Sequence, residues 1–202
     1  MIKPVLDGRF VRLEPLEERH RAAVRSAAQH PEIFTVTASA YGALYDPYID
    51  NALKRSDGIH ESAFAVLLKA QDNSKDRHVG MTRYLAIEAP HKRLEIGSTW
   101  YEPSVWAGTV NPECKLLLMR HAFETLKFHR VEYKTDARNA RSRAAILKLG
   151  ATQEGIFRRH MIMADGHVRD SVFFSIVDTD WPAVKAGLEK RLIGARTSRS
   201  AS

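Results

Sequence analysis

The sequence predicts a single mixed α/β domain. The chain has 202 residues, of which 44% are hydrophobic and 27% charged, enough for one ordinary core. Strand and helix patterns alternate along its second half, and neither a repeat nor a linker divides it. That alternation is typical of a sheet covered by helices. We therefore expect one domain over residues 1–194 and a disordered tail over 195–202.

Strand patterns dominate the first half of the chain. Alternating side chains over 8–16 predict a strand that stops at Pro15, and the composition of 17–29 predicts a helix that ends before His30-Pro31. The Tyr- and Pro-rich stretch after it contains a short predicted helix near 50–55. The further predicted elements are strands over 62–69, 79–87 and 93–101, with a hairpin loop over 71–78.

Two strand-to-helix junctions mark the second half. Strand 93–101 leads through small residues into a helix predicted over 112–127, with Asn111 as N-cap and Pro112 at the first helical position. A second predicted strand then leads into a second helix. The remaining predicted elements are strand 130–136, helix 140–149 ended by Gly150, strands 156–163 and 168–177 around a turn at Asp165-Gly166, and a helix from 180 to near 192.

Composition and simple motifs exclude several classes. The single cysteine, Cys114, cannot form an intrachain disulfide. No apolar leader and no run of 18 apolar residues occur, so we expect a cytoplasmic protein without a membrane partner. The motifs of nucleotide triphosphatases and Rossmann dehydrogenases are absent. The net charge of +7, concentrated late in the chain, suits a phosphorylated cofactor, RNA or an acidic protein.

Both junctions have features of a ligand site. Small residues over 107–110 precede a helix start, where unpaired N–H groups can bind an anion, although an ordinary tight turn has the same composition. At the second junction Asn139 and Ser142 lie three residues apart, so both could hydrogen-bond one ligand. Asn139 could equally cap its own helix.

A wider set of residues resembles a known family. Asn139-x-x-Ser142, with Ile146, Leu149-Gly150-Ala151 and Glu154-Gly155, is similar to the GNAT superfamily of acetyl-coenzyme-A-dependent N-acetyltransferases, and within it to the ribosomal-protein-alanine N-acetyltransferase branch. The similarity runs from about Gly8 to Leu192. One loop departs from the family pattern: Val105 and Val110 stand where a Gln or Arg and a small residue are usual, which leaves phosphate binding to backbone N–H groups.

The resemblance implies a mixed, mostly antiparallel sheet flanked by helices. Strands 93–101 and 130–136 would form a splayed central parallel pair, with the pantetheine arm of acetyl-coenzyme A (acetyl-CoA) between them and no metal. The implied cofactor-binding residues are Ser98, Thr99, Trp100, Tyr101 and Asn139 for the pantetheine, Gly108, Thr109, Val110 and Asn111 for the pyrophosphate, and Arg141, Arg143 and Lys148 for the 3′-phosphate or adenine.

The implied reaction is direct transfer of an acetyl group to a primary amine in a ternary complex. An α-amine with a pKa near ~8 is partly neutral at pH 7, unlike a lysine near ~10.4, so a protein or peptide N terminus is the expected acceptor. We expect Glu95 to act as base through a water and Ser142 to serve the leaving thiolate. Trp106 and His160 are expected beside the acceptor.

Two other functions stay open at this stage. The same chemistry could act on a small amine such as an antibiotic or a polyamine. Alternatively, the chain could be a catalytically weak coenzyme-A-binding or RNA-associated module, although a nucleic-acid partner is not the expectation. The resemblance is also compatible with a homodimer.

Overall fold

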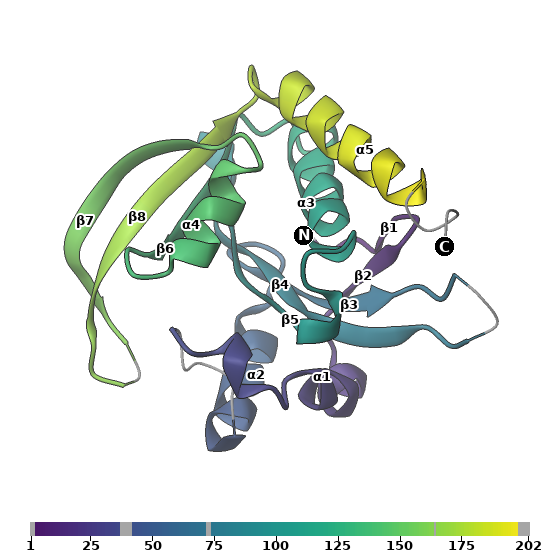
Figure 1. The fold of residues 1–202 in the computed structure, drawn as a ribbon. Coiled ribbons are helices and arrows are strands. Elements are labelled where there is room, and N and C mark those ends of the chain that lie inside the picture. The colour runs from purple at the N-terminus through teal and green to yellow at the C-terminus, as the bar shows by residue number, and fades with distance from the viewer. Residues whose placement is uncertain (1–2, 37–41, 72–73, 164, 198–202) are drawn as a thin grey trace.

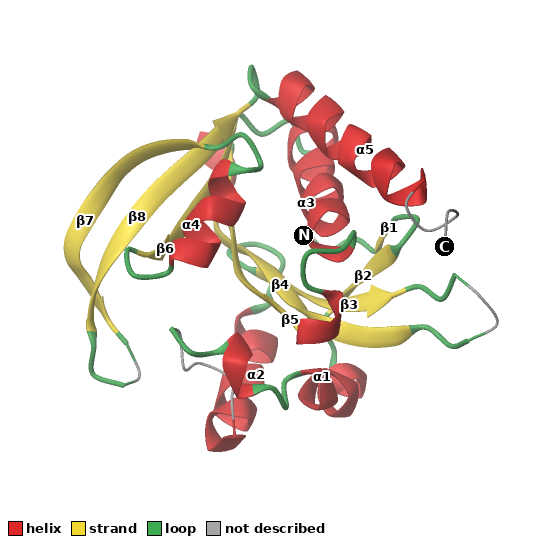
Figure 2. Ribbon diagram, in the orientation of Figure 1, coloured by secondary structure: helices red, strands yellow, loops and turns green. Residues whose placement is uncertain are grey.

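The computed structural model describes residues 3–36, 42–71, 74–163 and 165–197. These form one eight-stranded sheet in the order β1-β2-β3-β4-β5-β6-β8-β7, with helices against both faces (Figures 1 and 2). The strands are β1 (Leu6–Asp7), β2 (Val11–Pro15), β3 (Ser62–Leu68), β4 (Arg77–Glu88), β5 (Arg93–Tyr101), β6 (Arg130–Asp136), β7 (Thr152–Ile162) and β8 (Val168–Val177). The helices are α1 (Arg21–Ala27), α2 (Tyr45–Arg55), α3 (Val110–Arg120), α4 (Ala140–Leu147) and α5 (Trp181–Thr197).

The predicted splayed parallel pair is confirmed at the centre of the sheet. Every other pairing is antiparallel, but β5 and β6 run parallel, and they pair only over Arg93–Glu95 and Arg130–Glu132. Beyond these three residue pairs the two strands diverge. We call the resulting gap, between residues 97–101 of β5 and 133–136 of β6, the split.

Each face of the sheet has its own hydrophobic core. Leu94 and Val131 point toward α3 and α5, which lie side by side over one face in Figure 1. Met81 and Trp100 point to the other face, where α1 and α2 pack. Because successive residues of a strand point to opposite faces, this assignment fixes the faces of the side chains on β6 and of those on β5 before a bulge at Ser98. Beyond that bulge the alternation on β5 is offset by one residue.

The start of α3 differs from the sequence prediction. Thr109 is the N-cap residue, so Asn111 and Pro112 lie inside the first turn. Proline is tolerated there because the N–H groups of a first turn have no intrahelical acceptor, so its presence does not fix the start to one residue. No side chain caps the helix, which leaves the N–H groups of Val110 and Asn111 available.

Other boundaries also moved. The short helix predicted near 50–55 begins at Tyr45, and the last helix, predicted to end near residue 192, continues to Thr197. Strand β7 begins at Thr152, and β4 takes in the end of the predicted loop over 71–78. Residues 198–202 lie outside the described part of the chain. Of the described helices, none has the length and apolar content needed to cross a bilayer.

A buried carboxylate ties α3 to the first strands. Glu113 accepts backbone N–H groups from Arg9 at 3.0 Å, Phe10 at 2.6 Å and Val11 at 2.7 Å. A Cβ added to Gly8 would lie 2.7 Å from this carboxylate, so the glycine permits the close approach. In the structure Glu113 holds α3, and with it the helix start, against β2.

Candidate functional site

The split presents two backbone edges that do not pair with each other. On their outer sides β5 bonds to β4, and β6 bonds to β8. A bulge bends β5 at Ser98, whose φ is +47°, where the β4–β5 register shifts. Gly97 lies next to this bend. The inner edges can therefore receive an extended chain with amide groups.

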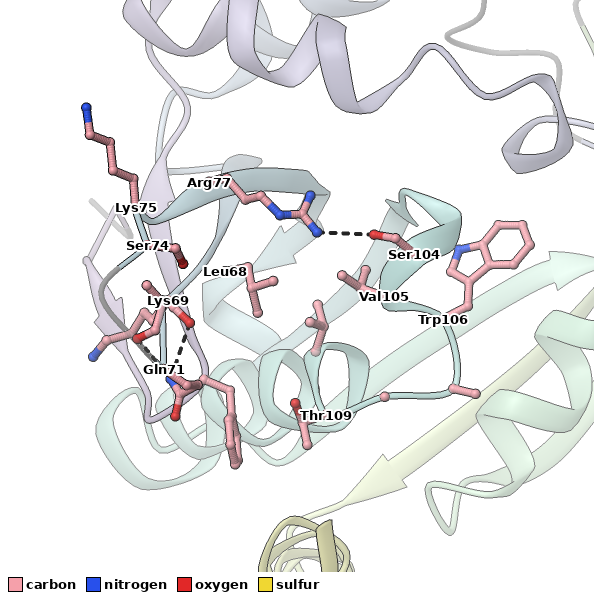
Figure 3. Close-up of a pocket in the computed structure, with 15 residues that line it drawn as sticks. Leu68, Lys69, Gln71, Ser74, Lys75, Arg77, Ser104, Val105, Trp106 and Thr109 are labelled. Atoms are coloured by element: carbon pink, nitrogen blue, oxygen red, sulfur yellow. Dashed lines mark hydrogen bonds between the residues drawn. The ribbon is translucent and has the colours of Figure 1, made fainter. Parts of the chain in front are cut away.

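The loop before α3 lines a cavity of about 450 Å³. Figure 3 shows its two walls, the 104–110 loop and the end of the β3–β4 hairpin. The hairpin supplies the basic side chains of Lys69, Lys75 and Arg77. Arg77 donates to Ser104 at 3.1 Å and pairs with Glu102. These cations were missed from the sequence because turn residues carry no signal of what they face.

Trp106 bridges the two sides of the split. Its indole Nε1 donates to the carbonyl of Tyr101 at 2.8 Å, and the guanidinium of Arg141 on α4 lies 4.2 Å from its ring centroid. His160, predicted to lie with Trp106 beside the acceptor, packs against Phe173 and bonds Ser171. The structure therefore places Trp106 at the cavity beside α3 and His160 on β7.

The start of α4 combines the two interpretations of Asn139. Its side-chain oxygen accepts the N–H of Ser142 at 3.0 Å, which is local capping, while its NH₂ group can still donate to a ligand. Of the three basic residues predicted nearby, Arg143 donates to the carbonyl of Ala137 at 3.3 Å. Lys148 lies at the opposite end of the helix. Only Arg141 therefore reaches the loop before α3.

Glu95 lies on the α1–α2 face of the sheet, at the closed end of the split. It is buried, and its Oε2 is 2.9 Å from Nζ of Lys134 on β6. Burial raises the pKa of the Glu95 carboxyl, and the Lys134 cation opposes that shift. Arg169 on β8 shares this face, and its buried Nε and Nη2 have no hydrogen-bond partner among the described residues.

His160 completes this group. Burial and the charges of Lys134 and Arg169 lower its pKa, which favours a neutral imidazole at pH 7. We call Glu95, Lys134, His160 and Arg169 the sheet-face cluster. The sequence identified Glu95 and His160 but missed their two cationic neighbours, because neither Lys134 nor Arg169 belongs to a motif.

Gly97 leaves the space that Glu95 occupies. A Cβ at this position would lie 2.7 Å from Oε1 of Glu95 and 2.9 Å from Cδ1 of Leu85. We expect Gly97→Ala to displace the carboxylate and lower kcat by about tenfold or more, with acetyl-CoA affinity retained. Steady-state kinetics of Gly155→Ala give the matched control, because nothing lies within 4 Å of the added Cβ there. Equal kcat values for the two variants would contradict the expectation.

Glu14, His20 and His78 form a separate cluster with metal-ligand chemistry. Nδ1 of His20 accepts the backbone N–H of Glu17 at 3.0 Å, so in the neutral ring Nε2 carries the proton and donates to Glu14 at 3.1 Å. A metal ion at Nε2 would have to displace this proton while Nδ1 stays hydrogen-bonded as an acceptor. We therefore interpret Glu14 and His20 as a hydrogen-bonded pair, with the His78 ring packed against His20, and assign the cluster no metal.

Comparison with known proteins decides the family. The model of the acetyltransferase (GNAT) domain matches residues 11–152. The chain belongs to the GNAT family. It is therefore an N-acetyltransferase, and GNAT enzymes take their acetyl group from acetyl-CoA. No curated protein matches the chain.

Solved structures place this GNAT enzyme among acetyltransferases. A GCN5-related N-acetyltransferase from Brucella melitensis is 31% identical, with a TM-score of 0.82 over 93% of this chain and 85% of that one. A T. thermophilus protein described as an acetyltransferase is 34% identical, also with a TM-score of 0.82, over 95% and 98%. Mycobacterium smegmatis RimJ in complex with CoA-disulfide shares the fold at 19% identity, with a TM-score of 0.71 over 92% and 88%.

Proposed function

We propose that this GNAT enzyme acetylates the α-amino group of a protein or peptide N terminus. The observation that carries the proposal is the charge of the sheet-face cluster. Its carboxylate, Glu95, is paired with Lys134, while Arg169 keeps two buried donors without partners among the described residues. Such a site attracts the carbonyl or carboxylate groups of a peptide. A polyamine or an aminoglycoside, which carries several cations, would be repelled.

Neighbouring carboxylates support the same choice. Those of β6 are already neutralised by bases nearby, so they offer little to a polycationic acceptor. Glu132 pairs with Arg93 and Arg130, and Asp136 pairs with Arg138.

The donor would lie along the split. Beyond their three residue pairs, the inner edges of β5 and β6 leave backbone amide groups without a strand partner. The two amides of a pantetheine arm could hydrogen-bond these groups. The pyrophosphate would lie at the end of the split where β5 and β6 are farthest apart. It would bind the N–H groups of Val110 and Asn111 at the positive end of α3. Arg141, which lies on the Trp106 ring, and Lys75, which lines the cavity, are the candidate cations for the 3′-phosphate. The NH₂ group of Asn139 would bond the pantetheine from the α4 side.

The acetyl transfer would take place at the closed end of the split, where Glu95 lies. A neutral α-amine attacks the thioester carbon at the closed end of the split. Glu95 accepts the proton released by the amine, through a water. A backbone N–H beyond the bulge, at Thr99 or Trp100, would stabilise the oxyanion.

Thiol release with an amine panel tests the acceptor. We expect a thermal shift with acetyl-CoA, followed by turnover with short peptides that have free N termini, highest for peptides with acidic side chains. Spermine and kanamycin should be poor substrates. Turnover confined to spermine or kanamycin would contradict the proposal, and turnover confined to simple monoamines would move it to small molecules. Absence of any thermal shift would contradict coenzyme binding itself.

Arg169 is expected to set the affinity for the peptide. Arg169→Met removes the unpartnered donors, so the KM for an acidic peptide should rise about tenfold, while the KM for acetyl-CoA stays within about twofold. Arg158→Met on exposed β7 is the matched control, and it should leave both constants near their original values. If Arg169→Met changes kcat alone, Arg169 does not bind the acceptor.

A further inference from the structure

Lys115 is a buried cation on the other face of the split. It extends from α3, and only 6% of its surface is exposed. Its Nζ donates to Oγ1 of Thr99 at 2.9 Å and lies 5.6 Å from the ring centroid of Tyr133. Thr99 follows the bulge on β5, and Tyr133 is the first residue of β6 beyond its pairing with β5. Lys115 therefore touches both walls at the closed end.

The surroundings of Lys115 offer no counter-charge. Thr99 is its single hydrogen-bond partner in the described part of the chain, and no ion pair forms there. A buried ammonium with two unused N–H groups is costly, and a core position of this kind would normally hold an aliphatic side chain. The free-energy cost of burying this ammonium suggests that a bound ligand accepts hydrogen bonds from its two unused N–H groups.

The carboxylate of Glu113, two residues before Lys115, accepts the N–H groups of Arg9, Phe10 and Val11. The other titratable groups around Lys115 in the described part of the chain are neutral over the working pH range. These groups are Cys114 on α3, Tyr101 on β5, Tyr133 on β6 and, behind it, Tyr84 on β4. Burial raises the pKa of the Cys114 thiol to about 12 and those of the three phenols well above their usual values. Burial also lowers the pKa of Lys115 to about 8, so this lysine exchanges a proton near neutrality.

The coenzyme would bring its sulfur to this place. If the phosphates bind at the start of α3 and the amides follow the split, the thioester ends where β5 and β6 meet. Glu95 reaches that point from the α1–α2 face, and Lys115 reaches it from the α3 face. The amine and the leaving group would then have separate proton-transfer partners on opposite sides of the sheet.

We propose that Lys115 is the general acid that protonates the departing coenzyme A thiolate. The proposal rests on the coenzyme position given above. The C–N bond forms as the amine attacks, the C–S bond breaks with its electron pair going to sulfur, and the Lys115 ammonium gives that sulfur a proton. The amine loses its own proton to Glu95, and water restores the proton on Lys115 after product release. A cation stabilises the thiolate more than the neutral Ser142 hydroxyl does.

The titration of bound coenzyme A tests this role without knowledge of the acceptor. Thiolate absorbs in the ultraviolet, so the difference spectrum between complex and free protein reports the thiol pKa. A nearby ammonium should keep that pKa at least about one unit lower in the native protein than in Lys115→Met, about a tenfold difference in thiolate content at a given pH. Cys114 stays silent at the pH values of this titration because of its raised pKa.

Kinetics supply the second measurement. Lys115 must be protonated to act, so kcat should fall as pH rises through about 8, the pKa of Lys115. This alkaline limb should vanish in Lys115→Met, with kcat lower by about 100-fold at pH 7. Lys127→Met on the surface is the control. Lys115→Gln guards against a folding defect in the methionine variant.

The possible outcomes distinguish a failure of the Lys115 role from a failure of the proposed coenzyme position. If coenzyme A binds both proteins and its thiol titrates identically, Lys115 is not the acid, while the coenzyme site stands. If coenzyme A binds neither protein, the coenzyme position fails and the role of Lys115 fails with it. A lower thiol pKa in the native protein, together with the lost alkaline limb, supports the proposal.

Discussion

Glu95→Gln is expected to lower kcat by about 100-fold, because it removes the proton acceptor while keeping the size of the side chain. The acid limb of the kcat profile should disappear as well. Glu95 must be ionised to accept a proton, so activity is lost as pH falls through its raised pKa. The KM for acetyl-CoA should stay near its original value.

The pH–rate measurement must distinguish the ionisation of Glu95 from that of the substrate amine. An α-amine with a pKa near ~8 also gives an acid limb in kcat/KM, since only its neutral form attacks. The kcat profile reports groups of the ternary complex and is the decisive one. Glu132→Gln, on the same face but paired with Arg130 at 2.7 Å, is a matched control. An unaltered kcat profile in Glu95→Gln would exclude Glu95 as the base.

Glu113→Ala is expected to give the largest loss of stability. The substitution leaves the N–H groups of Arg9, Phe10 and Val11 without their acceptor. Each unsatisfied buried donor costs about 1–3 kcal/mol, and partial rehydration reduces the total to roughly 3–5 kcal/mol. For a chain of this length, that loss should lower Tm by about 10 °C.

Calorimetry or urea unfolding measures this loss of stability, and substitution of an exposed carboxylate provides the comparison. Glu189→Ala breaks a solvent-exposed pair with Arg120 at 3.1 Å and should cost less than about 1 kcal/mol. A Glu113→Ala loss below that of Glu189→Ala would mean that α3 and β2 stay together without the carboxylate.

The sequence predicted the elements around the split most accurately. Strands 93–101 and 130–136 match β5 and β6, since alternating side chains between turn residues define a strand locally. The helix starts were harder. Asn111 was chosen as cap because Asn and Pro suit a helix start, but Thr109 holds that position, and the choice between them depends on how the 104–109 loop packs. The short β1 has too few residues for any pattern.

The site was predictable in part. Asn139 and Ser142 could be selected from their spacing, and Glu95 from the resemblance to the family. Their partners could not, because Lys134 meets Glu95 only through the register of β5 on β6, and Lys115 meets Thr99 only after the bulge at Ser98. Contacts set by register across distant strands leave no trace in local sequence.

The incomplete pairing of β5 with β6 also bears on the mechanics of the whole chain. Strands β1 to β5 form one part of the sheet and β6 to β8 the other, and three residue pairs join them directly. An arm that bonds both inner edges would act as a strand shared by the two parts. Donor binding would thereby stiffen the molecule across this seam, and release of the spent coenzyme would loosen it again.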